Sequence, residues 1–290
     1  MSTLVNSFAP FDAALVAAFE ANIRTALEED VGTGDLTAKL VPEHEMVSAR
    51  VIVRENAILC GAPWFEAVMR QLDARIRIQW HYAEGDLMDA DSTVCTIEAP
   101  ARALLTAERS ALNFMQLLSG VATATRKYVD MVAGTRAAIL DTRKTLPGMR
   151  LAQKYAVRVG GGKNQRLALY DGILIKENHI AAAGGIAPAL AAAQKLESGV
   201  TVQIEVEDLA QLQAALVSGA TSILLDNFTL DAMRKAVGMT QGRALLEASG
   251  GINMQTVRAI AETGVDRISI GSLTKDIRAT DYSLRIVETR

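Results

Sequence analysis

Hydrophobic and polar residues follow three successive patterns along this chain. Apolar residues recur at helical spacing over residues 12–29, which predicts an amphipathic helix. From residue 46 to 98 the period changes to two, as in the alternation from Val47 to Val53, and this predicts strands with one solvated face. Further strands are expected at 57–60, 75–82 and 92–98, with a short helix at 63–72. This block is predicted to form a small α+β domain.

The broad apolar pattern over residues 101–131 predicts one long helix, or two helices that meet near Gly120. Arg109 and Asn113 are four residues apart and share one side of it. An arginine on a helix surface is usually only solvated, so spacing alone gives no reason to assign Arg109 a function.

Beyond Ala137, short apolar runs alternate with helical patterns, as expected of βα units. The expected strands are 137–142, 172–176, 201–206, 222–226, 244–248 and 267–271. The expected helices include 151–159, 186–196, 209–217, 230–237 and 254–262. The last four strands begin roughly 20–23 residues apart, which suits either a doubly wound sheet or a (β/α) barrel. A polar residue follows every strand, and a barrel gathers all such strand ends around one site, so the pattern favours the barrel.

The first of these strands ends in a strongly basic stretch, Asp141-Thr142-Arg143-Lys144. Ligands of α/β folds bind at the carboxyl ends of the strands, so two adjacent cations there indicate an anion site. The alternative is a solvated basic turn.

Further charged residues are expected at the same edge. Lys176 directly follows an apolar strand. The run from Gly160 to Arg166 has neither the Walker spacing nor the Gly-x-Gly-x-x-Gly spacing, so it is weak evidence for nucleotide binding. Glu205 and Asp226 end neighbouring strands, and paired carboxylates suit Mg²⁺ or ribose hydroxyls. The alternative is a structural ion pair with a lysine at the same edge.

Two late loops carry glycine beside a hydroxyl group, Ser249-Gly250-Gly251 and Ile270-Gly271-Ser272. Glycine lets backbone N–H groups approach an anion, and the first loop is expected to open a helix whose N-terminus adds positive charge. Consecutive late βα loops of this kind are the usual phosphate site of a barrel. The alternative is a pair of tight turns that need glycine.

Composition narrows the class of protein. The formal net charge of −3 gives no basic surface for nucleic acid. The first ten residues do not have the pattern of a signal peptide, and no uncharged stretch is long enough to span a membrane. Cys60 and Cys95 lie in apolar runs, so we expect two buried thiols and a cytoplasmic protein. No metal-ligand spacing is seen, and no Ser-His or Cys-His arrangement, so electrostatic positioning is favoured over covalent catalysis.

Several separate blocks closely resemble the quinolinate phosphoribosyltransferase family, and the resemblance covers nearly the whole chain. The most specific blocks are 108–113, 141–148, 176–179, 205–207, 225–227 and 268–274. The resemblance implies an α/β protein with an N-terminal α/β sandwich domain, residues 1–112 joined by 276–290, and an incomplete TIM-like (β/α) barrel, residues 113–275. It also implies a homodimer, or a higher homo-oligomer, in which each site borrows residues from the partner.

The same resemblance implies the reaction: quinolinate and phosphoribosyl pyrophosphate give nicotinate mononucleotide, pyrophosphate and CO₂, with Mg²⁺. It makes Arg109 a quinolinate contact donated across the dimer interface. Substrate binding would further involve Thr142, Arg143, Lys144, Gln165, Arg166, Lys176, Glu205 and Asp226. Lys144, Lys176, Glu205 and Asp226 would act in catalysis, and the two acids would bind Mg²⁺, partly through water or substrate. The 5′-phosphate would be held by Ser249, Gly250, Gly251, Ile270, Gly271 and Ser272.

One position departs from the family pattern, which has His-Arg where this chain has Gln165-Arg166. Glutamine donates and accepts hydrogen bonds but transfers no proton near neutral pH, so this position is expected only to orient the substrate. Two rival functions remain: a related barrel transferase with another acceptor, and a nucleotide-binding protein without catalysis. The intact cations Arg143, Lys144 and Arg166 argue against the first, and the acids Glu205 and Asp226 argue against the second.

Overall fold

The computed structural model describes residues 4–196 and 199–289. The chain forms two compact units. The first comprises Met1–Arg126, Thr145–Gly161 and Thr274–Arg290, and the second comprises Lys127–Lys144 and Gly162–Leu273. The expected boundary at residues 112 and 113 lies inside α3 (Ala101–Met131), which is one continuous helix through Gly120. The first unit instead continues to Arg126, near the end of this helix. The segment Thr145–Gly161, which was expected to belong to the barrel, also belongs to the first unit.

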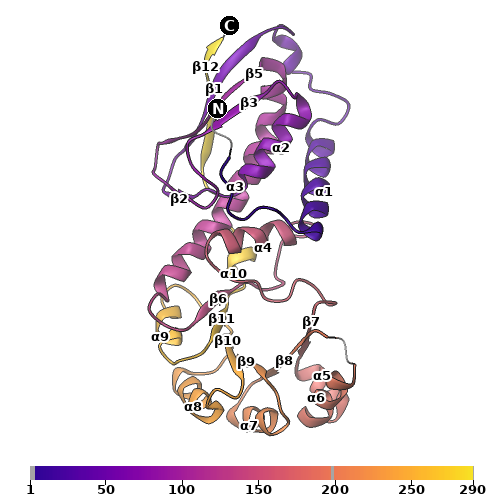
Figure 1. Ribbon diagram of the computed structural model, residues 1–290, viewed down its shortest axis with the longest axis vertical. Helices are drawn as coiled ribbons and strands as arrows, with labels where there is room; N and C mark the ends of the chain where they lie inside the picture. Colours follow the sequence, from indigo (N-terminus) through magenta and orange to yellow (C-terminus); the bar gives the residue numbers. More distant parts are fainter. Residues whose placement is uncertain (1–3, 197–198, 290) are drawn as a thin grey trace. The chain divides into compact units, whose positions relative to one another are not determined.

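The first unit combines an antiparallel sheet with helices (Figure 1). The sheet has the order β12-β1-β5-β3, and β2 pairs with β4 in a separate two-stranded ladder. Its strands are β1 (Met46–Val53), β2 (Ala57–Ile58), β3 (Arg77–Trp80), β4 (Leu87–Met88), β5 (Thr93–Pro100) and β12 (Tyr282–Thr289). Its other elements are α1 (Ala13–Asp30), the 3₁₀ helix η1 (Ala38–Leu40), α2 (Ala62–Leu72), α4 (Arg150–Val159) and the larger part of α3.

The period-two pattern of β1 correctly identified its core face. Val47, Ala49, Val51 and Val53 are buried, as predicted. Ile52 was expected on the opposite, solvated face but is also buried. A register shift against β5 between Val51 and Ile52 interrupts the regular alternation at this point.

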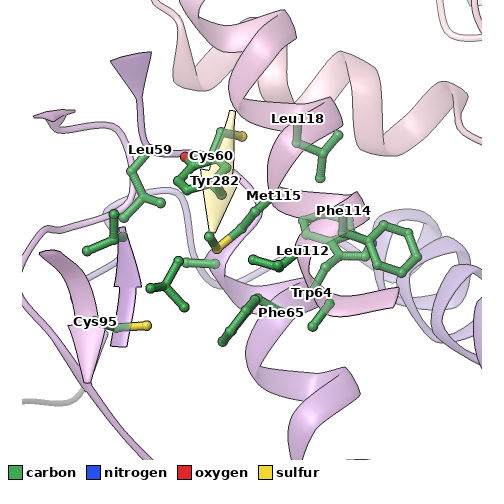
Figure 2. Packing of buried hydrophobic residues seen from close by; sticks show 14 of the residues in the cluster. Leu59, Cys60, Trp64, Phe65, Cys95, Leu112, Phe114, Met115, Leu118 and Tyr282 are labelled. Carbon is green, nitrogen blue, oxygen red and sulfur yellow. The ribbon is translucent and has the colours of Figure 1, made fainter. Parts of the chain in front are cut away.

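The core of the first unit is apolar and includes both cysteines as free, buried thiols, as expected. Figure 2 shows side chains from α2, α3 and β12 converging there, among them Trp64, Leu112, Met115 and Tyr282. The carboxylate of Glu84 is buried in this unit as well. It accepts hydrogen bonds from Gly61 N (2.8 Å), Ala62 N (3.2 Å) and the Tyr155 hydroxyl (2.9 Å). Glu84 therefore satisfies the first N–H groups of α2, while burial raises its pKa to about 7.

The second unit is built on a parallel sheet of order β6-β11-β10-β9-β8-β7. Its strands are β6 (Ala138–Leu140), β7 (Gly172–Ile175), β8 (Thr201–Val206), β9 (Ser222–Asp226), β10 (Leu245–Ser249) and β11 (Arg267–Ser269). The helices are α5 (Glu177–Ala183), α6 (Ile186–Lys195), α7 (Leu209–Val217), α8 (Leu230–Thr240), α9 (Val257–Ala261) and the start of α10 (Ser272–Lys275). Figure 1 shows a curved sheet with α5 to α9 along its outer side.

The barrel is incomplete, as predicted. Among the described residues no ladder joins β7 to β6, and a single bridge between Leu140 and Lys163 adds one residue beyond β6. β6 is shorter than expected because the chain leaves the ladder after Leu140, where the N–H of Asp141 donates to the carbonyl oxygen of Lys163.

Other elements differ in extent or were missed. α9 begins at Val257 rather than at 254, because Asn253 Oδ1 accepts from the N–H groups of Gln255 and Thr256 and holds a turn there. The short helix α5 and the strands β4 and β12 were not predicted. Within the described residues, no helix is both long enough and apolar enough to span a bilayer.

Candidate functional site

Strand register brings the predicted acids to one face of the sheet. Glu205 pairs with Leu224, and Asp226 pairs with Ser249. Paired residues of neighbouring parallel strands project to the same side, and so do residues two apart along a strand. Glu205, Asp226 and Ser249 therefore share one face at the carboxyl ends of β8, β9 and β10.

Lys176 meets Glu205 at this edge, with 3.8 Å between Nζ and a carboxylate oxygen. The Lys176 side chain is half exposed, whereas that of Glu205 is only 16% exposed. Burial raises the pKa of Glu205, the positive charge of Lys176 opposes this shift, and the negative charge of Asp226 reinforces it. The ion pair between a strand-end acid and a lysine is present, but both of its partners, Lys176 and Glu205, are predicted site residues.

The donor set at this edge suits Mg²⁺ bound together with a substrate. Mg²⁺ prefers oxygen ligands and is commonly held by one or two carboxylates plus water and substrate phosphates. Glu205 and Asp226 supply such carboxylates, and Asp226 Oδ2 also accepts a hydrogen bond of 2.9 Å from Asn227 Nδ2. No cluster of three or more acidic, histidine or cysteine ligands occurs among the residues described, so two protein carboxylates alone do not make a closed metal cage.

The positive charges of Arg143 and Arg166 act on each other unfavourably. Arg166 Nη1 donates to the carbonyl oxygen of Gly172 over 2.9 Å. Its pKa is lowered, first by burial and then by the positive charge of Arg143, although Asp171 opposes this shift. Arg143 Nε is buried and has no hydrogen-bond partner in the described part of the chain. A buried donor beside a second cation is costly by itself and is well suited to an anionic ligand.

Lys144 packs against Gly271, which lies in the second of the two candidate phosphate-binding loops. A Cβ atom on Gly271 would lie 3.0 Å from Lys144 Cδ and 3.7 Å from Thr142 Oγ1. The N–H of Lys144 also donates to Thr142 Oγ1 over 3.0 Å. The absence of a side chain at Gly271 thus lets the end of β6 and the end of β11 approach each other.

The other glycine loop interlocks with the end of β9. Gly250 has φ of +100°, and a Cβ atom there would overlap the Asn227 amide, with its Cγ only 2.7 Å away. The N–H of Asn227 donates to Ser249 O over 3.0 Å. The expectation that this loop leads directly into a helix is wrong, because α9 begins six residues after Gly251 and has five residues. α10 does begin at Ser272 but has only four, so backbone N–H groups rather than a long helix dipole are available to an anion here.

Gln165 is held at both its backbone and its side chain. Its N–H donates to Asp141 Oδ1 over 2.9 Å, and its Nε2 donates to Gln203 Oε1 over 2.9 Å. Gln203 Nε2 in turn donates to Glu247 Oε2, again over 2.9 Å. Gln203 and Glu247 are buried polar residues that the sequence analysis did not select. Their sequence pattern could have identified them, because each is a polar residue between apolar neighbours in a strand of a parallel sheet.

The structure therefore groups most of the predicted site residues in the second unit. These are Thr142, Arg143, Lys144, Gln165, Arg166, Lys176, Glu205, Asp226, Ser249, Gly250, Gly251, Ile270, Gly271 and Ser272. Arg109 belongs to the first unit, where its side chain is exposed on α3.

Comparison with known proteins gives a consistent result. Residues 35–119 match the family model of the N-terminal domain of quinolinate phosphoribosyl transferase, and residues 121–285 match that of its C-terminal domain. A probable nicotinate-nucleotide pyrophosphorylase [carboxylating] of Bacillus subtilis is 39% identical over 259 residues, 89% of this chain and 90% of the relative. The nicotinate-nucleotide pyrophosphorylase [carboxylating] of Mycobacterium leprae is 41% identical over 269 residues, 90% of this chain and 95% of the relative.

Solved structures are similar over the same extent. The nicotinate-nucleotide pyrophosphorylase of Francisella tularensis has a TM-score of 0.91 and 45% identity, covering 93% of this chain and 96% of its own. Since both family models match in order and the relatives align over most of their length, the chain belongs to the quinolinate phosphoribosyltransferase family.

Proposed function

We propose that this chain is a pentosyltransferase of NAD biosynthesis, a carboxylating nicotinate-nucleotide diphosphorylase. It transfers the phosphoribosyl group of phosphoribosyl pyrophosphate to quinolinate and releases pyrophosphate and CO₂, leaving nicotinate mononucleotide. The observation that carries this proposal is the pair of guanidinium groups on Arg143 and Arg166, in the same unit as the strand-end carboxylates Glu205 and Asp226. The names of the relatives support it.

Quinolinate carries two adjacent carboxylates, and the cationic residues suit it. Arg143 Nε, which has no hydrogen-bond partner among the described residues, and the guanidinium of Arg166 would each donate to a carboxylate. Lys144 would add a third cation. Thr142 and Gln165 would complete the contacts to the acceptor. This arrangement orients the ring so that its nitrogen faces the ribose carbon.

Phosphoribosyl pyrophosphate would lie along the ends of β8 to β11. The carboxylates of Glu205 and Asp226 would bind the ribose hydroxyls, with Lys176 beside the reacting carbon. The 5′-phosphate would be held by backbone N–H groups and hydroxyls of the two glycine loops, Ser249, Gly250, Gly251, Ile270, Gly271 and Ser272.

The proposed reaction uses electrostatic stabilisation rather than a protein nucleophile. Breaking the bond to pyrophosphate leaves positive charge on the ribose carbon, which Glu205 and Asp226 would stabilise. When bound through these two carboxylates, Mg²⁺ would supply charge neutralisation to the leaving pyrophosphate. The quinolinate nitrogen forms the new bond to the ribose carbon. The cationic ring then accepts the electron pair of the breaking bond to the adjacent carboxylate, CO₂ leaves, and a proton takes its place.

We further propose a homodimer, or a higher homo-oligomer, in which Arg109 of one subunit reaches the quinolinate bound by another. The exposed position of Arg109 on α3 supports this role. Mixing an Arg109→Ala variant with a Lys176→Met variant tests it: exchanged dimers contain one intact site, so about a quarter of the wild-type activity returns. Activity that stays at the level of the separate variants would contradict the shared site.

The reaction itself is tested with purified protein, quinolinate, phosphoribosyl pyrophosphate and Mg²⁺, following nicotinate mononucleotide and CO₂. Nicotinic acid, which lacks the second carboxylate, is the control acceptor. Product from quinolinate and not from nicotinic acid supports the proposal, whereas no product from folded protein favours a transferase with another acceptor. The free, buried thiols of Cys60 and Cys95 suit a reducing compartment, so we place this activity in the cytoplasm.

A further inference from the structure

Asn227 directly follows Asp226 at the end of β9, and none of the substrate contacts proposed above involves it. Its backbone is left-handed, with φ of +55°. Its N–H donates to Ser249 O over 3.0 Å, at the start of the first glycine loop, Ser249–Gly251. Asparagine adopts this conformation more readily than most residues, and glycine adopts it more readily still. A purely conformational role could therefore be filled by glycine.

The side chain of Asn227 holds the carboxylate of Asp226. Its Nδ2 donates to Asp226 Oδ2 over 2.9 Å. Within the described part of the chain, the Asp226 carboxylate has no other hydrogen bond and no ion pair, whereas that of Glu205 is paired with Lys176. The Asn227 amide therefore limits the rotation of this carboxylate. An ionised carboxylate has about four acceptor sites, so Asp226 can keep this bond while it binds ribose hydroxyls or Mg²⁺.

The same amide packs against the first glycine loop. A Cβ atom on Gly250 would lie 2.7 Å from Asn227 Cγ and closer still to Oδ1, so the amide occupies the space that a side chain at 250 would need. One side chain thus contacts both the carboxylate proposed to bind the ribose hydroxyls and the loop proposed to bind the 5′-phosphate.

These two binding groups would act on one small molecule. In a pentose 5-phosphate, the ring hydroxyls and the phosphate are joined by a few covalent bonds, so the distance between them varies little. A site binds both groups at once only when its own binding groups have the matching separation, and simultaneous binding raises the affinity above that for either group alone.

We propose that Asn227 is a positioning residue that sets the separation between Asp226 and the first glycine loop and thereby fits the site to a pentose 5-phosphate. This inference rests on the function proposed above. It assigns Asn227 an effect on phosphoribosyl pyrophosphate that passes through Asp226 and Gly250, and no effect on quinolinate.

The first test separates the amide from the backbone conformation. Asn227→Gly keeps the left-handed backbone and removes the amide, so we expect Tm to remain near that of the wild type. KM for phosphoribosyl pyrophosphate should rise about tenfold, the usual effect of losing a hydrogen bond to a charged group, while KM for quinolinate changes less than about twofold. Asn227→Ala should raise the same KM equally and also lower Tm by about 2–4 °C, because its Cβ is strained at positive φ.

The matched control is Gln241→Gly. Gln241 is likewise an amide residue at positive φ (+48°), but it ends α8 at the opposite edge of the sheet from the candidate site, so neither KM should change. If Asn227→Gly also leaves KM for phosphoribosyl pyrophosphate unchanged, Asn227 has only a conformational role and the proposal is wrong.

A double-mutant cycle tests the contact with Gly250. Gly250→Ala should lower Tm less in the Asn227→Gly background than in the wild type, because the Cγ and Oδ1 atoms that the new methyl group would overlap are gone. An equal fall in both backgrounds would mean that the amide does not pack against the loop, which would overturn the proposal.

The decisive measurement compares the dissociation constants of ribose 5-phosphate and methyl phosphate, each measured by competition with phosphoribosyl pyrophosphate. Asn227→Gly should weaken ribose 5-phosphate about tenfold and methyl phosphate less than about twofold, because only the first ligand spans both groups. Equal weakening would show that the amide merely supports the loop, and the proposal would be wrong. These are binding measurements, so they do not depend on the acceptor. Turnover of the wild-type chain with quinolinate tests the proposed function separately, and a failure of one is distinguishable from a failure of the other.

Discussion

We predict that Arg143 lowers the stability of the ligand-free protein while contributing to binding of the acceptor. Its Nε is buried without a hydrogen-bond partner in the described residues, and its charge depresses the pKa of Arg166. An unsatisfied buried donor costs about 1–3 kcal/mol, and the neighbouring positive charge adds to this cost. In Arg143→Met the stem of the side chain remains while both penalties are removed. We therefore expect the ligand-free protein to be more stable by about 1 kcal/mol, equivalent to a rise of about 2–4 °C in Tm.

The same substitution should damage quinolinate binding. A hydrogen bond to a charged group contributes about 1.5–3 kcal/mol, which corresponds to an increase of about 10- to 150-fold in KM for quinolinate. The assays are steady-state kinetics and thermal unfolding with and without quinolinate. The rise in Tm that quinolinate causes in the wild type should be largely lost in the variant, because ligand stabilisation follows affinity.

The control is Arg234→Met on α8, where an exposed arginine pairs with Asp231 over 2.8 Å. Exposed pairs of this kind contribute about 0–1 kcal/mol, so this variant should retain both Tm and KM. The reasoning is refuted if Arg143→Met lowers Tm and leaves KM for quinolinate unchanged, because Arg143 would then be a structural residue.

Three further predictions concern other parts of the site. Lys176 lowers the pKa of Glu205, so Lys176→Met should move the Glu205 titration, followed by carboxyl ¹³C NMR, to higher pH, and the carboxylate should be lost earlier on acidification. Gly250→Ala combines a positive φ with overlap of the Asn227 amide and should destabilise the protein by about 2–3 kcal/mol in a denaturant titration. Gln165→His should neither raise kcat nor add a limb at about pH 6–7 to the pH–rate profile.

Each of these has a control or a contradicting result. Lys235→Met on the surface helix α8 should leave the Glu205 titration unchanged, and a Glu205 pKa that falls in Lys176→Met would reverse the sign of the argument. Gly251 also has positive φ (+58°), but a Cβ atom there meets no atom within 4 Å, so Gly251→Ala should cost only about 1 kcal/mol. Equal losses at the two glycines would exclude the contact with Asn227 as the cause. A faster Gln165→His variant with a new pH limb would mean that this position transfers a proton.

The strands of the second unit were predictable because their signals are local. β8 alternates apolar and polar residues, and β9 is a short apolar run bounded by polar residues. Their observed bounds, Thr201–Val206 and Ser222–Asp226, coincide with those expected. Since all strands of a parallel sheet end at one edge, the grouping of Glu205 and Asp226 followed from the strand order alone.

Features that depend on distant pairing were not predictable in the same way. β12 pairs with β1, which lies more than two hundred residues earlier, and its alternation includes exposed Ile286 and Val287 rather than a clear apolar face. The role proposed for Arg109 rests on family resemblance alone, because an exposed arginine on a helix has no distinguishing local pattern. Gln203 and Glu247 are polar residues in otherwise apolar surroundings, but their hydrogen bonds join strands β8 and β10 and the loop residue Gln165, which are far apart in the sequence.

We propose that quinolinate binds at the strand ends of the second unit through the guanidinium groups of Arg143 and Arg166. A crystal structure with quinolinate and a non-hydrolysable analogue of phosphoribosyl pyrophosphate tests it most directly. We predict that the two carboxylates accept hydrogen bonds from Arg143 Nε and from the Arg166 guanidinium, with the ring nitrogen facing the ribose carbon above Glu205 and Asp226. Quinolinate bound elsewhere, or bound with its carboxylates away from both arginines, would contradict this binding mode.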